Sequence, residues 1–286
     1  MPRFLRLFMV LPQLGMLLST ACGGDGERKE QPEYNLAFLN VVVGTPGVDV
    51  FLNATKLASD VAFGALANMR VPVGSDRLEA FTHSDSPTPP SEAPLFVLNL
   101  IAAEKDGSVL AVADGDVDPQ TPEYVAPEAQ LYANGFAVYP PNLAIRFVHA
   151  APDLPGLRTI GIRDNDASAT MGTLLVDSLN FRRDSGAQGI PVAPLGLPGA
   201  FLGIGRQGGV LTSGGPVGVT VDSYDPRQAL YRFSPSGELV SGERMYLVIA
   251  GSKDQGAAPD RRLQLLRIAA NTDGSFAAPV PVALLP

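Results

Sequence analysis

Apolar and polar residues alternate in short runs along most of the chain. In 48–53 (VDVFLN) and 77–82 (RLEAFT), apolar or small residues recur at every second position. The runs are closed by Gly, Pro, Asn or Asp, which suit turns, and apolar residues at helical spacing are nearly absent. The pattern therefore predicts an all-β fold of many short strands at the spacing of a β-sandwich. Strands are expected at 35–44, 48–53, 57–63, 66–73, 77–82, 95–102, 109–113, 143–149, 159–163, 172–181, 189–192, 217–224, 245–250 and 263–268.

The chain also repeats itself. NLAF at 35–38 recurs as NLAI at 142–145, and each copy continues as an apolar run that ends near a Pro-Gly pair. A repeat of this length indicates two similar units. We expect two immunoglobulin-like antiparallel β-sandwich domains in tandem, 34–125 and 126–286, with a Gly/Pro-rich insertion at 194–216 in the second.

The first residues are typical of an export signal. Arg3 and Arg6 precede an apolar stretch at 7–18, and small residues lead to Cys22, the single cysteine. A basic start, a short apolar core and small residues describe a secretory signal peptide, here 1–21. The polar segment that follows, 22–33, cannot bury anything, so a flexible tether is expected.

Cys22 resembles the lipidated cysteine of bacterial lipoproteins. That resemblance implies that Cys22 carries acyl chains such as palmitate, which anchor the exported chain to the membrane. Gly23 follows the cysteine, and in enterobacterial lipoproteins the lack of an aspartate there implies the outer membrane. The alternative is an ordinary signal peptide whose cysteine falls near the cleavage site.

Charge narrows the range of partners. Removing 1–21 takes away two arginines, so 21 basic residues fall to 19 against 29 acidic ones, a net charge of −10. An acidic chain without a basic cluster excludes nucleic acid as a partner. The membrane, through Cys22, and an envelope protein or polysaccharide remain.

Three segments together resemble the family known as domain of unknown function 4397. They are VHAAPDLPG at 148–156, VDVFLN at 48–53 and VAFGALANMRVPVG at 61–74, and the late strand MYLVIAG at 245–251 is similar as well. The resemblance implies a β-sandwich module of exported bacterial proteins, often in tandem. It implies no reaction.

Three aspartates, Asp114, Asp116 and Asp118, alternate in the segment 114–118. Carboxylates at this spacing can hold calcium, although Pro119 stands where an EF-hand needs glycine. We therefore keep two hypotheses, a calcium-stiffened loop between the domains and a solvated acidic linker. No other cofactor is expected.

Neither histidine is accompanied in the sequence by the partner residues of a known catalytic motif. His149 precedes Asp153 by four residues, but Val42 stands opposite His149 in the repeat, so a strand end and a turn capped by Asp153 are predicted rather than a catalytic pair. His83 and His149 fall in different repeats and the only cysteine is Cys22, so a zinc site is not expected. Neither histidine shows a recognisable supporting partner, and no G-x-S-x-G motif is present.

The segment 203–208 spells G-x-G-x-x-G, but glycines and a proline follow it. They exclude the helix that a dinucleotide site requires, so a glycine-rich loop is predicted. The sequence as a whole predicts a non-enzymatic, lipid-anchored envelope protein with a binding, adhesion or assembly role. The alternatives are an envelope carbohydrate or peptide hydrolase with its site in the second domain, near 194–216, and a calcium-dependent adhesion module.

Overall fold

The computed structural model describes most of the chain after residue 30. The described residues are 31–75, 77–100, 107–120, 124–137, 143–153, 157–163, 174–192, 201–206, 231–234, 242–252 and 262–285. Within them every regular element is a β-strand, which confirms the all-β prediction. No helix in this part of the chain is long and apolar enough to cross a membrane.

Two sets of strands follow one another along the chain, and we call them the first and second halves. The first half contains β1 (Glu33–Asn40), β2 (Val48–Leu52), β3 (Thr55–Val61), β4 (Leu66–Pro72), β5 (Arg77–Thr82), β6 (Phe96–Asn99), β7 (Ser108–Asp114) and β8 (Glu128–Ala133). The second half contains β9 (Leu143–Ala150), β10 (Leu157–Arg163), β11 (Leu174–Leu179), β12 (Ile190–Val192), β13 (Phe201–Arg206), β14 (Tyr231–Ser234), β15 (Arg244–Ala250), β16 (Gln264–Ala269) and β17 (Val280–Leu285).

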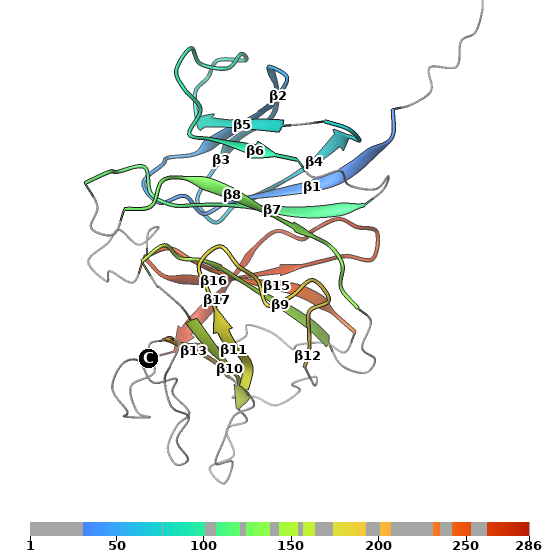
Figure 1. Ribbon diagram of the computed structural model, residues 1–286, viewed down its shortest axis with the longest axis vertical. Helices are drawn as coiled ribbons and strands as arrows, with labels where there is room; N and C mark the ends of the chain where they lie inside the picture. Colours follow the sequence, from blue (N-terminus) through green and yellow to red (C-terminus); the bar gives the residue numbers. More distant parts are fainter. Residues whose placement is uncertain are drawn as a thin grey trace, which may run out of the picture. The chain divides into compact units, whose positions relative to one another are not determined.

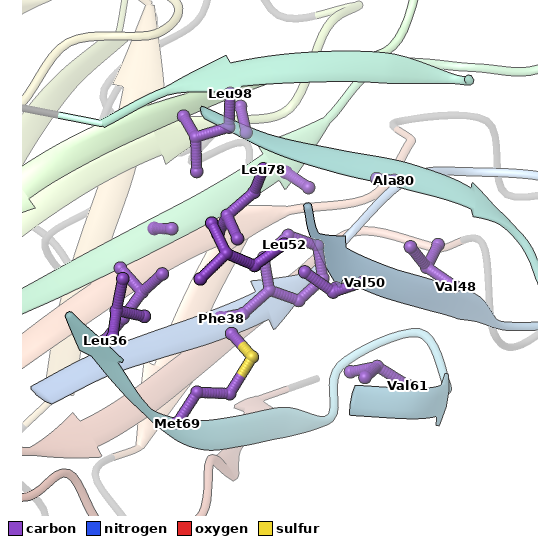
Figure 2. Close-up of a cluster of buried hydrophobic side chains, with 14 of the residues drawn as sticks. Leu36, Phe38, Val48, Val50, Leu52, Val61, Met69, Leu78, Ala80 and Leu98 are labelled. Carbon is purple, nitrogen blue, oxygen red and sulfur yellow. The ribbon is translucent and has the colours of Figure 1, made fainter. Parts of the chain in front are cut away.

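The first half consists of two sheets that enclose a hydrophobic core. Their strand orders are β4-β1-β7-β8 and β3-β2-β5-β6, and only the pair β1 and β7 is parallel. Alternate residues of facing strands point inward, as alternation along a strand requires. Figure 2 shows this core, in which Leu36 and Phe38 of β1 lie near Val50 and Leu52 of β2 and Met69 of β4.

The second half repeats the strand order of the first. Its nine-stranded sheet contains the order β12-β9-β15-β16, with β9 and β15 as the parallel pair, and the order β11-β10-β13-β14. Adding eight to each strand number of the first half gives these two orders. The last strand, β17, pairs with β14 on one side and β16 on the other, so it joins the two groups into one sheet.

The two halves share a second hydrophobic core. Leu36 and Phe38 of β1 face the first core, whereas Ala37 and Leu39 face the second, because side chains alternate along a strand. Strands β9, β15 and β16 supply the opposite side, and Figure 1 shows these strands lying next to the sheet of β1, β7 and β8. The strand β1 is thus buried on both faces, and Gln31–Pro286 forms one compact unit.

A buried arginine lies in this shared core. The guanidinium of Arg146 on β9 is 5.4 Å from the ring centre of Tyr132 and 5.5 Å from that of Tyr246. It donates to the carbonyl oxygen of Ala133 at 2.6 Å and pairs with the carboxylate of Asp184. The charge is therefore compensated by an anion, a carbonyl and two aromatic faces, which a buried cation requires.

Two sets of strand pairings bear on the expected boundaries. A first domain ending at 125 would separate β8 from β7, although the two strands pair along their length, so the first half extends to Ala133. The expected insertion at 194–216 contains the strand β13, which pairs with β10 and β14. The strands β8, β14 and β17 were also absent from the sequence prediction.

Candidate functional site

The most heavily bonded side chain in the described residues of the first half is the buried carboxylate of Asp49. Asp49 lies on β2 between Val48 and Val50, which face the first core, so its own side chain lies on the outer face of the sheet. The residue is 0% exposed. A buried carboxylate needs several donors, and five surround this one.

The five donors come from β3 and from the start of the loop after β5. The ammonium of Lys56 donates to Oδ2 at 2.8 Å, and the hydroxyl of Ser59 and the amide of Asp60 donate to Oδ1 at 3.2 and 2.8 Å. The imidazole Nδ1 of His83 donates to Oδ1 at 2.8 Å, and the amide of Ser84 donates to Oδ2 at 3.1 Å. Burial raises the pKa of the carboxyl of Asp49, but the hydrogen bonds from Lys56, His83 and the amides of Asp60 and Ser84 outweigh it and hold this pKa below its ordinary value.

An irregular strand end brings the β3 donors into place. The pairing of β2 with β3 shifts register between Val48 and Phe51, which marks a bulge. Asp60 has a φ of 50°, in the left-handed region that few non-glycine residues adopt. Its side chain lies against Gly47, where a Cβ would be 2.1 Å from Oδ1 of Asp60. Glycine at position 47 therefore permits the close approach that aims the Asp60 amide at Asp49.

His83 and Asp49 form an oriented histidine–carboxylate pair. Because a carboxylate can only accept, Nδ1 of His83 carries the proton, and Nε2 lies on the other side of the ring, 3.9 Å from Oδ1 of Asp85. The hydrogen bond to Asp49 raises the pKa of His83, and the charges of Asp49, Asp60 and Asp85 act in the same direction. The side chain is 28% exposed, so Nε2 can exchange a proton with solvent.

This pair was missed in the sequence because its members are 34 residues apart. The signal that could have found it is a single aspartate within an apolar strand, VDVF at 48–51, since a buried carboxylate needs a partner. Chemically, the pair can orient an imidazole and move a proton. The neighbouring hydroxyl of Ser59 bonds Asp49, and that of Ser84 is buried without a hydrogen-bond partner.

The other histidine lies where a strand ends, as predicted. His149 is the penultimate residue of β9 and is 0% exposed, and a turn follows at 152–153. Its Nδ1 accepts from the amide of Ala151 at 3.3 Å, and its ring meets that of Phe181 edge to face at 5.7 Å. Asp153 accepts from the hydroxyl of Ser252 at 2.7 Å, a contact that the sequence did not suggest.

The three aspartates considered for calcium have separate contacts. Asp114 is buried and pairs with Arg182, whose Nε lies 2.8 Å from Oδ1. Asp116 accepts from the amide of Asp118 at 2.8 Å, and Asp118 accepts from the amide of Gln120 at 2.9 Å. Among the residues that the structure describes, no three His, Cys, Asp or Glu residues form a group able to hold a metal ion. The calcium site stays a prediction.

Arg182 connects Asp114 to the second half. It has a φ of 61° and reaches the first half, where it pairs with Asp114 and Glu128 and donates to the carbonyl oxygen of Ala126 at 2.8 Å. Burial nevertheless raises the pKa of Asp114 to about 7, because the Arg182 charge only partly offsets the loss of hydration.

The raised pKa of Asp114 predicts a pH dependence of stability. In the unfolded chain an aspartate ionises near pH 3.9, so between about pH 4 and 7 the folded state binds more protons. The contribution of this carboxyl to stability is therefore complete below about pH 4 and is lost as the pH rises to about 7. We expect Asp114→Asn to remove a slope of at most about 1.4 kcal/mol per pH unit, measured by urea denaturation across this range.

Asp118→Asn is the matched control, because Asp118 is exposed and lies outside the Arg182 cluster. Its slope should equal that of the unaltered chain. Equal slopes for the unaltered chain and Asp114→Asn would contradict the prediction.

Several residues considered in the sequence lie outside the described residues. They are Cys22 with the whole of 1–30, the glycines after 206, and the parts of 194–216 on either side of β13. The first four residues of the G-x-G-x-x-G segment, 203–206, belong to β13, so the expected glycine-rich loop was wrong for them.

The fold defines the class of protein as all-β, with an eight-strand arrangement that occurs twice. Residues 34–160 match the family model described as Domain of unknown function (DUF4397). The match confirms the resemblance found in the sequence and covers β1–β9 and the beginning of β10. No curated protein matches the chain.

Proposed function

We propose that the protein is a non-enzymatic, lipid-anchored component of the bacterial cell envelope that binds or assembles with another envelope molecule. The observation that supports this most is the core shared by the two halves, from β1 and β7 on one side to β9, β15 and β16 on the other. A shared core holds two sets of loops in a fixed relation, and loops on a rigid scaffold are where binding sites occur. The acyl chains on Cys22 and the tether 22–33 would keep this scaffold at the membrane, with the outer membrane as its location.

Crosslinking in cells tests this proposal. The chain with Cys22 and its Cys22→Ala variant are crosslinked and recovered side by side, and the bound protein and polysaccharide are identified. We expect one defined protein partner with the anchored form and its loss with Cys22→Ala, because the anchor places the loops next to that partner. Recovery of the same polysaccharide with both forms would replace the assembly role with glycan binding. Recovery of neither molecule with either form would refute the proposal.

The pair of His83 and Asp49 favours a second candidate, an envelope hydrolase, with its proton-transfer group in the first half rather than near 194–216. An imidazole whose Nδ1 is held by a carboxylate can act as a general base through Nε2. Hydrolysis of an envelope ester or glycan that disappears in His83→Asn, with folding unchanged, would establish this candidate. Equal turnover by the unaltered chain and by His83→Asn would exclude His83 from the reaction.

A calcium-dependent adhesion module is the third candidate, and it rests on the sequence pattern of Asp114, Asp116 and Asp118. Its test is the melting temperature with calcium and with a chelator. Equal values would exclude it, because a ligand that binds only the folded state raises the melting temperature.

A further inference from the structure

The loop between β5 and β6, residues 83–94, is attached at its beginning to a single buried carboxylate. The side chain of His83 and the amide of Ser84 both donate to Asp49. The ammonium of Lys56 bonds Asp49 and also donates to the carbonyl oxygen of Ser84 at 3.0 Å. A change in how strongly Asp49 is bonded therefore acts directly on the start of the loop.

The imidazole of His83 lies between two carboxylates that belong to different parts of the structure. Asp49 is part of β2 and its side chain is 1% exposed, whereas Asp85 is part of the loop and its side chain is fully exposed. Nδ1 is 2.8 Å from Asp49, and Nε2 is 3.9 Å from Asp85. A neutral ring presents a lone pair to Asp85, and a protonated ring presents an N–H donor.

Among the described residues, the charges that act on His83 come from three elements. Asp49 is on β2, Lys56 and Asp60 are on β3, and Asp85 is on the loop itself. Three carboxylates thus face one ammonium, and a proton on His83 supplies a second positive charge. Because Asp49 stays ionised well below the range in which histidine titrates, His83 is the group of this set that changes charge near neutral pH.

We propose that His83 is a protonation-sensitive clasp for the loop 83–94. The imidazolium joins Asp49 on the sheet to Asp85 on the loop and holds the start of the loop in place, whereas the neutral ring keeps only its bond to Asp49. The loop is therefore held most firmly at mildly acidic pH and loosens as the pH rises.

The sign of this effect follows from the direction of the titration. A histidine whose pKa is raised by folding stabilises the folded form fully below its unfolded pKa of about 6.5, and this contribution is lost as the pH rises through the higher folded value. Asp49 does not contribute to this pH dependence, because its pKa lies below its ordinary range and it stays ionised near neutral pH.

Hydrogen exchange on the full chain tests the clasp. The protection factors of the amides of Ser84 and Leu95 are measured at about pH 5.5 and 8.5 and divided by that of a buried β1 amide, which cancels changes in global stability. We expect the relative protection of Ser84 to be about threefold greater at the lower pH. Equal relative protection at both values would overturn the proposal.

Two variants make the test specific. His83→Asn retains a donor in the place of Nδ1 but does not titrate, so its relative protection should be the same at both pH values. Asp85→Asn removes the carboxylate on the loop and should reduce the difference while leaving the fold intact, because Asp85 is exposed. If either variant kept the whole difference in relative protection between the two pH values, another group would be its cause. An NMR titration of the His83 ring below its ordinary pKa would overturn the proposal independently.

Discussion

Replacing Asp49 with alanine should destabilise the protein by about 4 kcal/mol, the loss typical of removing one partner of a buried charge pair. The substitution leaves the ammonium of Lys56 and the amides of Asp60 and Ser84 without their acceptor. A buried donor without an acceptor destabilises the folded state by more free energy than its hydrogen bond contributes when formed. The measurement is the midpoint of urea denaturation with its slope, compared with the unaltered chain.

The control for Asp49→Ala is Asp85→Ala, which removes an exposed carboxylate of the same cluster. It should change stability by no more than about 0.5 kcal/mol. Asp49→Asn should fall between the two, because an amide retains one accepting oxygen. A loss below about 1 kcal/mol in Asp49→Ala would mean that the donors find water instead, and the cluster would then not be a structural centre.

Replacing Tyr246 with alanine should cost about 4 kcal/mol, within the range for truncating a large aromatic residue in a core. Among the residues that the structure describes, Tyr246 is the largest of the fully buried side chains, and it lies in the core that both halves share. Its ring meets Phe136 edge to face at 5.0 Å and contacts Phe276 at 5.9 Å. The substitution also removes one of the two aromatic faces beside the charge of Arg146.

The shared core adds a second expectation for Tyr246→Ala. Because strands of both halves contribute to this core, the loss should appear in one cooperative unfolding transition, observed by calorimetry and by circular dichroism. Tyr124→Ala is a matched control, since Tyr124 is 42% exposed and should tolerate truncation. Two separate transitions, with only one of them shifted, would mean that the halves unfold independently.

Alternation of residue types was sufficient to predict several of the described strands. The run at 77–82 corresponds to β5 without change. The prediction failed where composition suggested something else. The glycines at 203 and 205 indicated a loop, but β13 is held between β10 and β14, because pairing on both sides outweighs a weak local preference.

The candidate site was beyond the sequence for a different reason. The repeat placed His149 opposite a valine and so favoured a strand end, where the structure places this residue. No local pattern joins Asp49 to His83, because β2 and β5 become neighbours only in the folded sheet. The same limit applies to Arg182 and Asp114, whose contact links the two halves across 68 residues.

The place of β1 in its sheet determines how the protein would bear mechanical load. The chain enters the fold at Glu33 and runs directly into β1, which lies between β4 and β7 and is bonded to both. Tension on the residues before Glu33 would pull β1 along its own axis, against the backbone hydrogen bonds on both edges at once and not one after another. A protein held at the membrane by its amino-terminal end would thus meet an external force with one of its most deeply embedded strands.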